Sequence, residues 1–438
     1  MMDIKLILEK QLDFKDVDFL NDFMSNLSIA TLSNENVLNL LRDPNQQFDA
    51  VIGEWMFSEL YSVFPAVFQC PFIWFSTLEP HWFILSLIDE PLHPAYNPDY
   101  GDSLQPPFTF AQRLYVLYKQ IEGLFSKNFR YFYKEEAAYL RLVAPILKQR
   151  GLPVPNYQEL KFNASMILGN SHVSMGSAPK LPQNYKNIGG YHIKEKVDAL
   201  PEDLQKIMDN AKDGVIYFSL GSNLQSKDLP TETKKGLLNV FRGLKQTVIW
   251  KFEEVLPDSP KNVHVIQWAP QPSILAHPNC VLFITHGGLL SLTEAIHYAV
   301  PLIAIPVFAD QFSNAERVAY KGFGVKFDIS YTMHEELGGA IHEVLGNLKY
   351  TEKVKELSLI YHDRPVKPGA ELVHWVEHVV RTRGAAHLRS PALHVPLYQK
   401  LYLDLVALVI IALWIIKTVV KRTLCKIKIR VETTKKLN

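Results

Sequence analysis

His286, Gly287 and Gly288 come directly after Cys280–Thr285, an apolar stretch with the length and composition of a buried strand. The residues that follow, Ser291–Ala299, have the composition of a helix. A strand that enters a helix through glycines directs unpaired backbone N–H groups and the positive end of the helix dipole at one point. Such a point binds anions, and His286 can add a hydrogen-bond donor. The pattern predicts a phosphate site, with an ordinary tight turn as the alternative.

Other residues near this turn in the sequence suit the remaining parts of a nucleotide that carries a sugar. Ser291 offers a hydroxyl group. Glu294, one turn further along, is placed to accept from a ribose diol, as acidic residues do in other nucleotide-binding folds. Trp268 offers a flat apolar face for a base, although a core aromatic is the alternative. Asp310 and Gln311 follow the next buried strand and suit the hydroxyl groups of a sugar.

The order of these motifs is more specific than any one of them. W-x-P-Q, H-G-G, S-x-x-E and D-Q over Trp268–Gln311 closely resemble the signature of the UDP-glycosyltransferases, the membrane-bound animal kind. The resemblance runs from about Phe48 to the C-terminus and includes Phe218–Ser222 (FSLGS) and His362–Pro368 (HDRPVKP). It implies transfer of glucose or glucuronate from a UDP-sugar to a hydroxyl of a small lipophilic acceptor. The family reaction inverts the anomeric carbon and uses no metal, and UDP-sugar is a substrate, so no cofactor is expected.

The resemblance also implies a role for each donor-binding residue. The turn at His286, together with Ser222, would stabilise the negative charge of the departing UDP. Trp268 would stack on uracil, while Gln271 and Glu294 would hold the ribose. The implied donor-binding residues are Ser222, Trp268, Gln271, His286, Gly287, Gly288, Ser291, Glu294, Asp310 and Gln311. The last two would orient the transferred sugar.

The catalytic base is the point at which the chain departs from the family pattern. Family members have a histidine after the first strand, oriented by a carboxylate, usually aspartate, at the end of a later strand. Phe48–Gly53 matches that later strand, and Glu54, one methylene longer, stands at the carboxylate position. No histidine precedes His81, which follows a different strand and is not assigned the role. The first strand, its loop and a secretory signal are all missing, so we expect an N-terminal truncation. The alternative is a membrane-anchored UDP-sugar-binding protein with little or no transfer.

Composition limits the class of protein. A chain of 438 residues is long enough for two domains. The formal net charge of +1 gives no electrostatic case for nucleic acid as a partner. Cys70, Cys280 and Cys425 have neither a disulfide pattern nor metal-ligand spacing, and no metal site is expected. The resemblance leaves open homo- or hetero-oligomers with other family members.

Strands alternate with helices in both halves of the chain, which predicts two parallel sheets covered on both faces. With the resemblance, this predicts an α/β fold of two Rossmann-like domains facing across a cleft, called GT-B, plus a C-terminal transmembrane helix. The expected divisions are an incomplete acceptor-binding domain at 1–195, a UDP-sugar-binding domain at 196–385, a linker at 386–400, a transmembrane helix at 401–420 and a basic tail at 421–438. Amphipathic helices are expected over 13–27 and 36–43. The N-terminal aromatics fit either the acceptor pocket or the core: Trp55, Trp74, Phe75, Trp82 and Phe83.

Leu401–Val420 has the length and composition of a helix that crosses a bilayer, with a buried helix of a soluble protein as the alternative. The basic residues after it are expected to remain cytosolic, which would place the body in the lumen. Lys435 and Lys436 are similar to the di-lysine retrieval signal of endoplasmic-reticulum proteins. The expected location is therefore the endoplasmic-reticulum membrane, with a single span.

Overall fold

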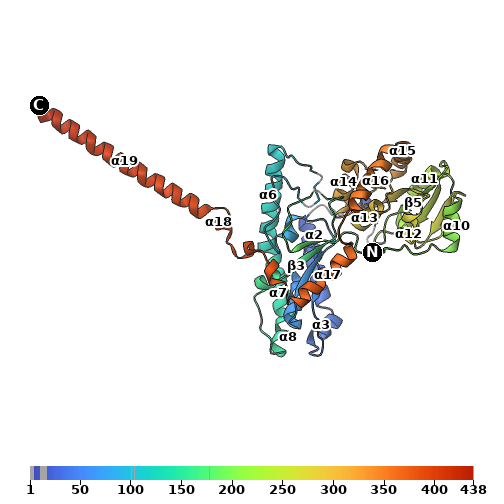
Figure 1. Ribbon diagram of the computed structural model, residues 1–438, viewed down its shortest axis with the longest axis horizontal. Helices are drawn as coiled ribbons and strands as arrows, with labels where there is room; N and C mark the ends of the chain where they lie inside the picture. Colours follow the sequence, from blue (N-terminus) through green and yellow to red (C-terminus); the bar gives the residue numbers. More distant parts are fainter. Residues whose placement is uncertain (1–3, 10–16, 100, 103, 177, 438) are drawn as a thin grey trace. The chain divides into compact units, whose positions relative to one another are not determined.

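The computed structural model of the chain describes residues 4–9, 17–99, 101–102, 104–176 and 178–437 (Figure 1). It contains two compact units, Met1–Arg389 and Ser390–Asn438. The first unit holds two parallel sheets, and the second holds a long C-terminal helix.

The first sheet has the strand order β1-β2-β3-β4, and all its pairs are parallel. The strands are β1 (Val51–Glu54), β2 (Phe72–Ser76), β3 (Met166–Gly169) and β4 (Tyr185–Asn187). The helices of this half are α2 (Val17–Leu32), α3 (Glu35–Arg42), α4 (Phe64–Phe68), α5 (Trp82–Leu85), α6 (Phe110–Ser126), α7 (Phe132–Leu142), α8 (Ala144–Gln149) and α9 (Tyr157–Lys161). The N-terminal helix α1 (Ile4–Leu8) instead buries Ile4 in a core of the second sheet. A π-helical turn, Lys127–Tyr131, joins α6 to α7.

Alternate residues of the first sheet face two different cores, as the two-residue period of a strand requires. Phe72 and Trp74 of β2 pack with α5 and α2 in one core. Ile73, between them, packs in the other core with Val379 of α17 (Pro368–Arg381). The helix α17 follows the second sheet in the sequence yet covers a face of the first, beside β3 (Figure 1).

The second sheet has the order β10-β9-β8-β5-β6-β7, again entirely parallel. Its strands are β5 (Val215–Ser219), β6 (Thr247–Lys251), β7 (Val263–Ile266), β8 (Cys280–Thr285), β9 (Leu302–Ala304) and β10 (Gly324–Lys326). The helices of this half are α10 (Glu202–Asn210), α11 (Thr231–Arg242), α12 (Gln271–Ala276), α13 (Leu289–His297), α14 (Gln311–Lys321), α15 (Met333–Gly346) and α16 (Leu348–His362). The helices α11 and α15 share one core with the sheet, while α10, α12, α13 and α14 share the core on its other face. The helix α16 contributes to both, with Tyr350 in the first core and Val354 in the second.

Several expected elements differ in detail from those in the structure. The short apolar run Ile188–Gly190 predicts a strand, and the structure has this strand three residues earlier, as β4. Residues 191–209 stand between the two alternating patterns and are predicted to link the halves, but the structure has most of α10 (Glu202–Asn210) in this segment. The helices α2 and α3 lie where amphipathic helices were expected, although residues 13–16 of the first prediction lie outside the described residues. The elements α12 and β10 were not predicted, because six and three residues carry too little periodicity to be distinguished from loops. The 11-residue helix α14 was also not predicted.

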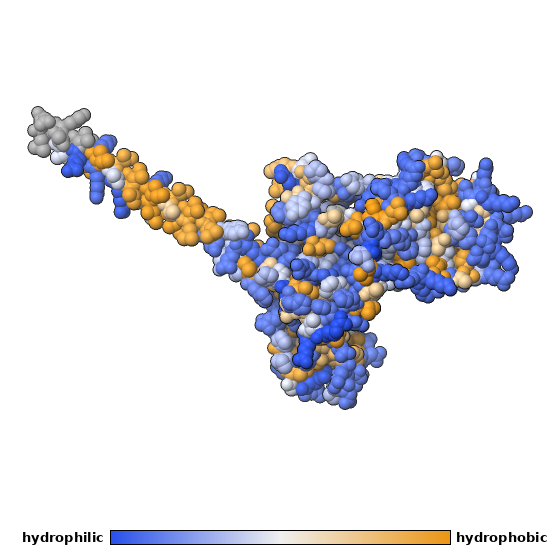
Figure 2. Space-filling view, in the orientation of Figure 1, coloured by the Kyte–Doolittle hydropathy of each residue, from blue (hydrophilic) through white to orange (hydrophobic). Residues whose placement is uncertain are grey.

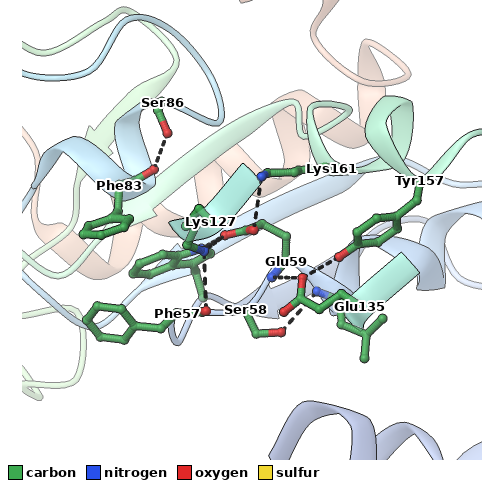
Figure 3. A network of polar contacts seen from close by, with 11 residues as sticks. Phe57, Ser58, Glu59, Phe83, Ser86, Lys127, Glu135, Tyr157 and Lys161 are labelled. Atoms are coloured by element: carbon green, nitrogen blue, oxygen red, sulfur yellow. Dashed lines mark hydrogen bonds and ion pairs between the residues drawn. The ribbon is translucent and has the colours of Figure 1, made fainter. Parts of the chain in front are cut away.

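A buried ionic network fixes the chain after β1 (Figure 3). Glu59 accepts hydrogen bonds from Trp55 Nε1 at 3.0 Å and from Lys127 Nζ, and Lys161 Nζ lies 3.5 Å from its other oxygen. Lys127 Nζ also lies 3.4 Å from the carbonyl oxygen of Phe57. Glu135 accepts from the backbone N–H of Glu59 at 3.3 Å. The network therefore ties residues 55–59 to the π-helical turn, α7 and α9.

The second unit is dominated by α19 (Leu403–Leu437). Among the described residues, the stretch Leu403–Arg430 is long and apolar enough to cross a membrane, and none of its most apolar window is buried. Figure 2 shows an apolar surface along most of this helix.

Candidate active site

A cleft of about 730 Å³ lies in the first unit, lined by residues from both of its halves. The half with the first sheet contributes Met56 and Thr77, among others, and the half with the second sheet contributes the carboxyl-terminal ends of its strands. This is the edge at which open parallel sheets bind ligands. Every predicted donor-binding residue except Gly287 lines the cleft: Ser222, Trp268, Gln271, His286, Gly288, Ser291, Glu294, Asp310 and Gln311.

The turn between β8 and α13 directs a helix N-terminus at the cleft. Gly287 has φ +82°, a conformation that L side chains rarely adopt, and Asn314 Nδ2 donates to its carbonyl oxygen at 3.1 Å. The helix begins at Leu289, two residues before the predicted start, so Gly288 to Ser291 all line the cleft. The first N–H groups of a helix have no intrahelical acceptor, so this turn presents donors to a ligand.

His286 is packed between two glycines at this turn. A Cβ atom on Gly288 would lie 2.7 Å from its Nε2 atom, and one on Gly221 would lie 2.7 Å from its Cε1 atom. Burial, together with the charge of Lys251, lowers the pKa of His286 to about 4. The imidazole is therefore neutral near pH 7, and it can serve as a hydrogen-bond donor but not as a cation.

Gln271 and Glu294 meet in the cleft although they lie on different helices. Gln271 Nε2 donates to Glu294 Oε2 at 2.9 Å and to Ser291 Oγ at 3.1 Å. The second oxygen of Glu294, Oε1, lies 3.0 Å from His192 Nε2. The glutamate side chain is thus held in one orientation at the wall of the cleft.

Trp268 lies at the open side of the cleft with 76% of its surface exposed, which excludes the alternative of a core aromatic. Lys251 Nζ lies 5.9 Å from the centre of its ring, donates to the carbonyl oxygen of Gly221 at 2.9 Å, and pairs with Glu253 at 3.0 Å. Lys251 was not predicted as a site residue. The signal that could have found it is a charged residue at the carboxyl end of the buried strand β6.

Asp310 and Gln311 lie where β9 leads into α14. The Gln311 side-chain carbonyl accepts from the backbone N–H groups of Val307 and Phe308 at 3.0 and 3.1 Å, so its amide group remains to serve a ligand. Asp310 accepts from Asn314 Nδ2 at 2.7 Å. Burial raises the pKa of Asp310 to about 6, against the opposing effects of that hydrogen bond and of a nearby arginine.

The other end of the cleft is apolar. Phe23 and Met24 come from α2, Met56 and Phe57 follow β1, and Leu78 follows β2. The aromatics considered for this role lie elsewhere. Four of them belong to a buried core, and the fifth packs against Tyr191 at 5.5 Å: Trp55, Trp74, Trp82, Phe83 and Phe75.

Glu54 does not line the cleft. It is the last residue of β1 and is exposed. Burial raises the pKa of Tyr191, and the nearby charge of Glu54 raises it further. His81 also lies outside the cleft, with its ring 5.1 Å from that of Trp55, and burial lowers its pKa to about 3. Among the described residues, neither of these groups is positioned to act on a ligand in the cleft.

The described residues contain no cluster of three or more His, Cys, Asp or Glu side chains with the geometry of a metal site. The cysteines Cys70, Cys280 and Cys425 are free thiols.

Two parallel sheets with a ligand-sized cleft at the carboxyl ends of their strands define a two-domain α/β fold, and solved structures agree with this fold. A UDP-glucosyltransferase from Polygonum tinctorium matches with a TM-score of 0.54 at 17% identity, covering 82% of each chain. The calicheamicin glycosyltransferase CalG4 matches with a TM-score of 0.51 at 18% identity, covering 82% of this chain and 81% of that one. These likenesses confirm the predicted GT-B fold.

Sequence comparison gives the family. The profile of the family described as UDP-glucoronosyl and UDP-glucosyl transferase matches residues 8–437. UDP-glycosyltransferase UGT5 of Dactylopius coccus is 33% identical over 394 residues, which are 88% of this chain and 73% of that protein. UDP-glucuronosyltransferase 2B15 of Rattus norvegicus is 29% identical over 400 residues, 89% of this chain and 72% of the relative. The chain belongs to the UDP-glucoronosyl and UDP-glucosyl transferase family.

Proposed function

We propose that the chain transfers a hexosyl group, glucose or glucuronate, from a UDP-sugar to a hydroxyl group of a small lipophilic acceptor. The observation that carries this proposal is the polarity of the cleft. Helix-terminal N–H groups, His286 and Glu294 gather at one end, while Phe23, Met24 and Phe57 line the other. A charged donor and an apolar acceptor would thus meet in one cavity.

On the donor side, the diphosphate would lie against the start of α13, next to Ser222 and His286. The N–H groups and the neutral imidazole would stabilise the charge that develops on the departing UDP, so that transfer would need no metal. The uracil would stack on the exposed indole of Trp268, and Gln271 and Glu294 would bind the ribose hydroxyls. Asp310 and Gln311 would orient the sugar for attack on the face opposite the diphosphate, which inverts the anomeric carbon.

A second candidate function is supported by the acceptor end of the cleft. Leu20, Phe23, Met24, Met56, Phe57 and Leu78 offer no side chain able to take a proton, and among the described residues Glu54 and His81 lie outside the cavity. A general base within reach of the acceptor hydroxyl is needed for efficient transfer. The second candidate is therefore a membrane-anchored protein that binds UDP-sugars and transfers them slowly or not at all.

We further propose a single span in the endoplasmic-reticulum membrane through α19, with the first unit in the lumen. This rests on the apolar stretch Leu403–Arg430 and on the basic residues that follow Val420, among them Lys435 and Lys436.

The test uses the full chain purified in detergent. UDP binding is measured by calorimetry, and glycoside formation is measured with UDP-glucose and UDP-glucuronate and a phenolic acceptor. Glycoside formed above the level of a His286→Ala variant supports transfer. UDP binding without glycoside formation favours the second candidate, whereas failure to bind UDP rules out both.

A further inference from the structure

We propose that His192 is a positioning residue that holds Glu294 in the orientation needed to bind the donor ribose. This inference rests on the donor-binding role proposed above for Glu294. It gives the segment that joins the two halves of the first unit a part in nucleotide binding.

The contact itself is short and largely shielded from water. His192 Nε2 lies 3.0 Å from Glu294 Oε1, and the two side chains are only 20% and 8% exposed. A carboxylate only accepts hydrogen bonds, so Nε2 carries the proton in this pair. Hydrogen bonds to a charged partner are stronger than neutral ones, and low exposure strengthens them further.

His192 completes the set of donors around Glu294. Gln271 Nε2 donates to Oε2 at 2.9 Å, so each carboxylate oxygen accepts from a different part of the chain. With both oxygens engaged, the carboxylate cannot rotate, and its remaining lone pairs point in fixed directions. Without His192, one oxygen of this nearly buried carboxylate would lose its partner and the group would be free to turn away from the ribose.

His192 lies in the segment that joins the two halves, whereas Glu294 lies in the second half on α13. The Tyr191 ring next to it lies 5.7 Å from the imidazole and 5.5 Å from Phe75 of β2. Tyr191 also packs against the apolar cluster that contains Leu168 of β3 in the first sheet. His192 is thus anchored to the first sheet while its imidazole reaches a side chain of the donor site.

His192 does not itself line the cleft, so its effect would be exerted through Glu294. This makes a specific prediction about the ligand. The loss caused by removing His192 must depend on the ribose hydroxyls, because these are the groups that Glu294 would bind. A general loosening of the fold would weaken every ligand alike.

The experiment compares UDP with 2′,3′-dideoxy-UDP, measuring each dissociation constant by calorimetry on the full chain in detergent. The variants are His192→Ala, His192→Gln, Glu294→Ala and the double variant His192→Ala/Glu294→Ala. The matched control is His277→Ala, because His277 Nε2 also meets a carboxylate, Asp209, at 3.1 Å but lies away from the cleft. A thermal melt of each variant shows whether it is folded.

His192→Ala should weaken UDP by about tenfold, the scale of one charge-assisted hydrogen bond, and leave dideoxy-UDP within about twofold of the wild type. His192→Gln, which keeps an N–H donor, should recover part of the loss, and the double variant should lose no more than Glu294→Ala. The control should bind both ligands normally.

Other outcomes distinguish failure of the positioning role of His192 from failure of the proposed donor site. If Glu294→Ala weakens UDP selectively but His192→Ala does not, His192 has no positioning role and the proposed donor site stands. Equal losses for both ligands in His192→Ala indicate a structural role only, which overturns the proposal. If Glu294→Ala itself has no ribose-dependent effect, the donor assignment fails and the positioning role fails with it.

Discussion

The imidazole of His286 lies so close to the backbone of Gly221 that a Cβ atom there would stand 2.7 Å from its Cε1 atom. Gly221 follows β5 and His286 follows β8, and these strands are neighbours in the second sheet. The two turns therefore meet at the histidine, and a glycine at position 221 is needed for space as well as for its φ of +87°.

Gly221→Ala should therefore displace His286 and weaken UDP binding. Its matched control is Gly151→Ala, since Gly151 has φ +68° with nothing within 4 Å of an added Cβ. Both variants carry backbone strain, on the order of 1–2 kcal/mol, but only the first carries the clash. Equal losses of UDP affinity in the two variants, measured by calorimetry, would mean that the contact with His286 is unimportant.

His286→Ala should lower the rate of transfer by about 10²-fold, as comparable losses of a charge-stabilising donor do. Because the pKa of His286 is lowered to about 4, the histidine remains neutral from pH 6 to 8, and the ratio of wild-type to variant rate should be constant over that range. The measurement is the initial rate of glycoside formation at several pH values. A ratio that rises towards pH 6 would indicate a cationic role instead.

Trp268→Ala should weaken UDP by about 1–3 kcal/mol, the range found for a base stacked on an aromatic side chain, and Trp268→Phe should lose less. Since 76% of the indole surface is exposed, the melting temperature should change little. Calorimetry with UDP and a thermal melt check both statements. Unchanged UDP affinity in Trp268→Ala would remove this residue from the nucleotide site.

The parts of the site that depend on local sequence were predictable. Gly287, Gly288 and Ser291 lie within a few residues of His286, so a strand–turn–helix pattern was enough to place them together. Ser222 and Gln271 reach the site from other elements, and only the resemblance to the family predicted them. Two further residues at the site were not predicted. Lys251 comes from a neighbouring strand and His192 from 102 residues before Glu294, and no local period connects such pairs.

The first half was harder to predict for the same reason. Glu54 was assigned from its place at the end of a strand, but whether a side chain there reaches the cleft depends on the neighbouring packing, and Glu54 is exposed and does not line the cleft. The apolar end of the cleft uses Phe23 and Met24 of α2, whose place in three dimensions depends on long-range contacts with α6 and α7. The location of α17 on the first sheet is likewise a non-local result.

The network around Glu59 predicts an asymmetry in stability (Figure 3). Lys127→Met should destabilise the chain by about 3–5 kcal/mol, because it removes a partner of a buried carboxylate. The double variant Lys127→Met/Glu59→Gln should recover part of this loss. Lys119→Met, which breaks the more exposed pair with Glu122 at 2.9 Å, should cost no more than about 1 kcal/mol. Chemical denaturation in detergent measures the differences, and equal losses in the two single variants would contradict a buried network.

Glu79 predicts how stability changes with pH. Burial raises its pKa to about 7, above the usual 4.5, despite the opposing charges of Arg317 and Lys321, while the charge of Asp310 raises it further. The folded chain therefore holds this proton more tightly than the unfolded chain does. The resulting stabilisation is complete below pH 4.5 and is lost as the pH rises through 7.

Glu79→Gln removes this proton exchange while keeping the shape of the side chain. The unfolding free energy of the variant minus that of the wild type should increase by on the order of 3 kcal/mol as the pH rises from 5 to 8. The measurement is the difference in unfolding free energy between the two proteins at each pH, which cancels the titration of the other groups. A difference that stays constant with pH would show that Glu79 ionises alike in the folded and unfolded chains, and a difference of the opposite sign would mean that its charged form is the stabilised one.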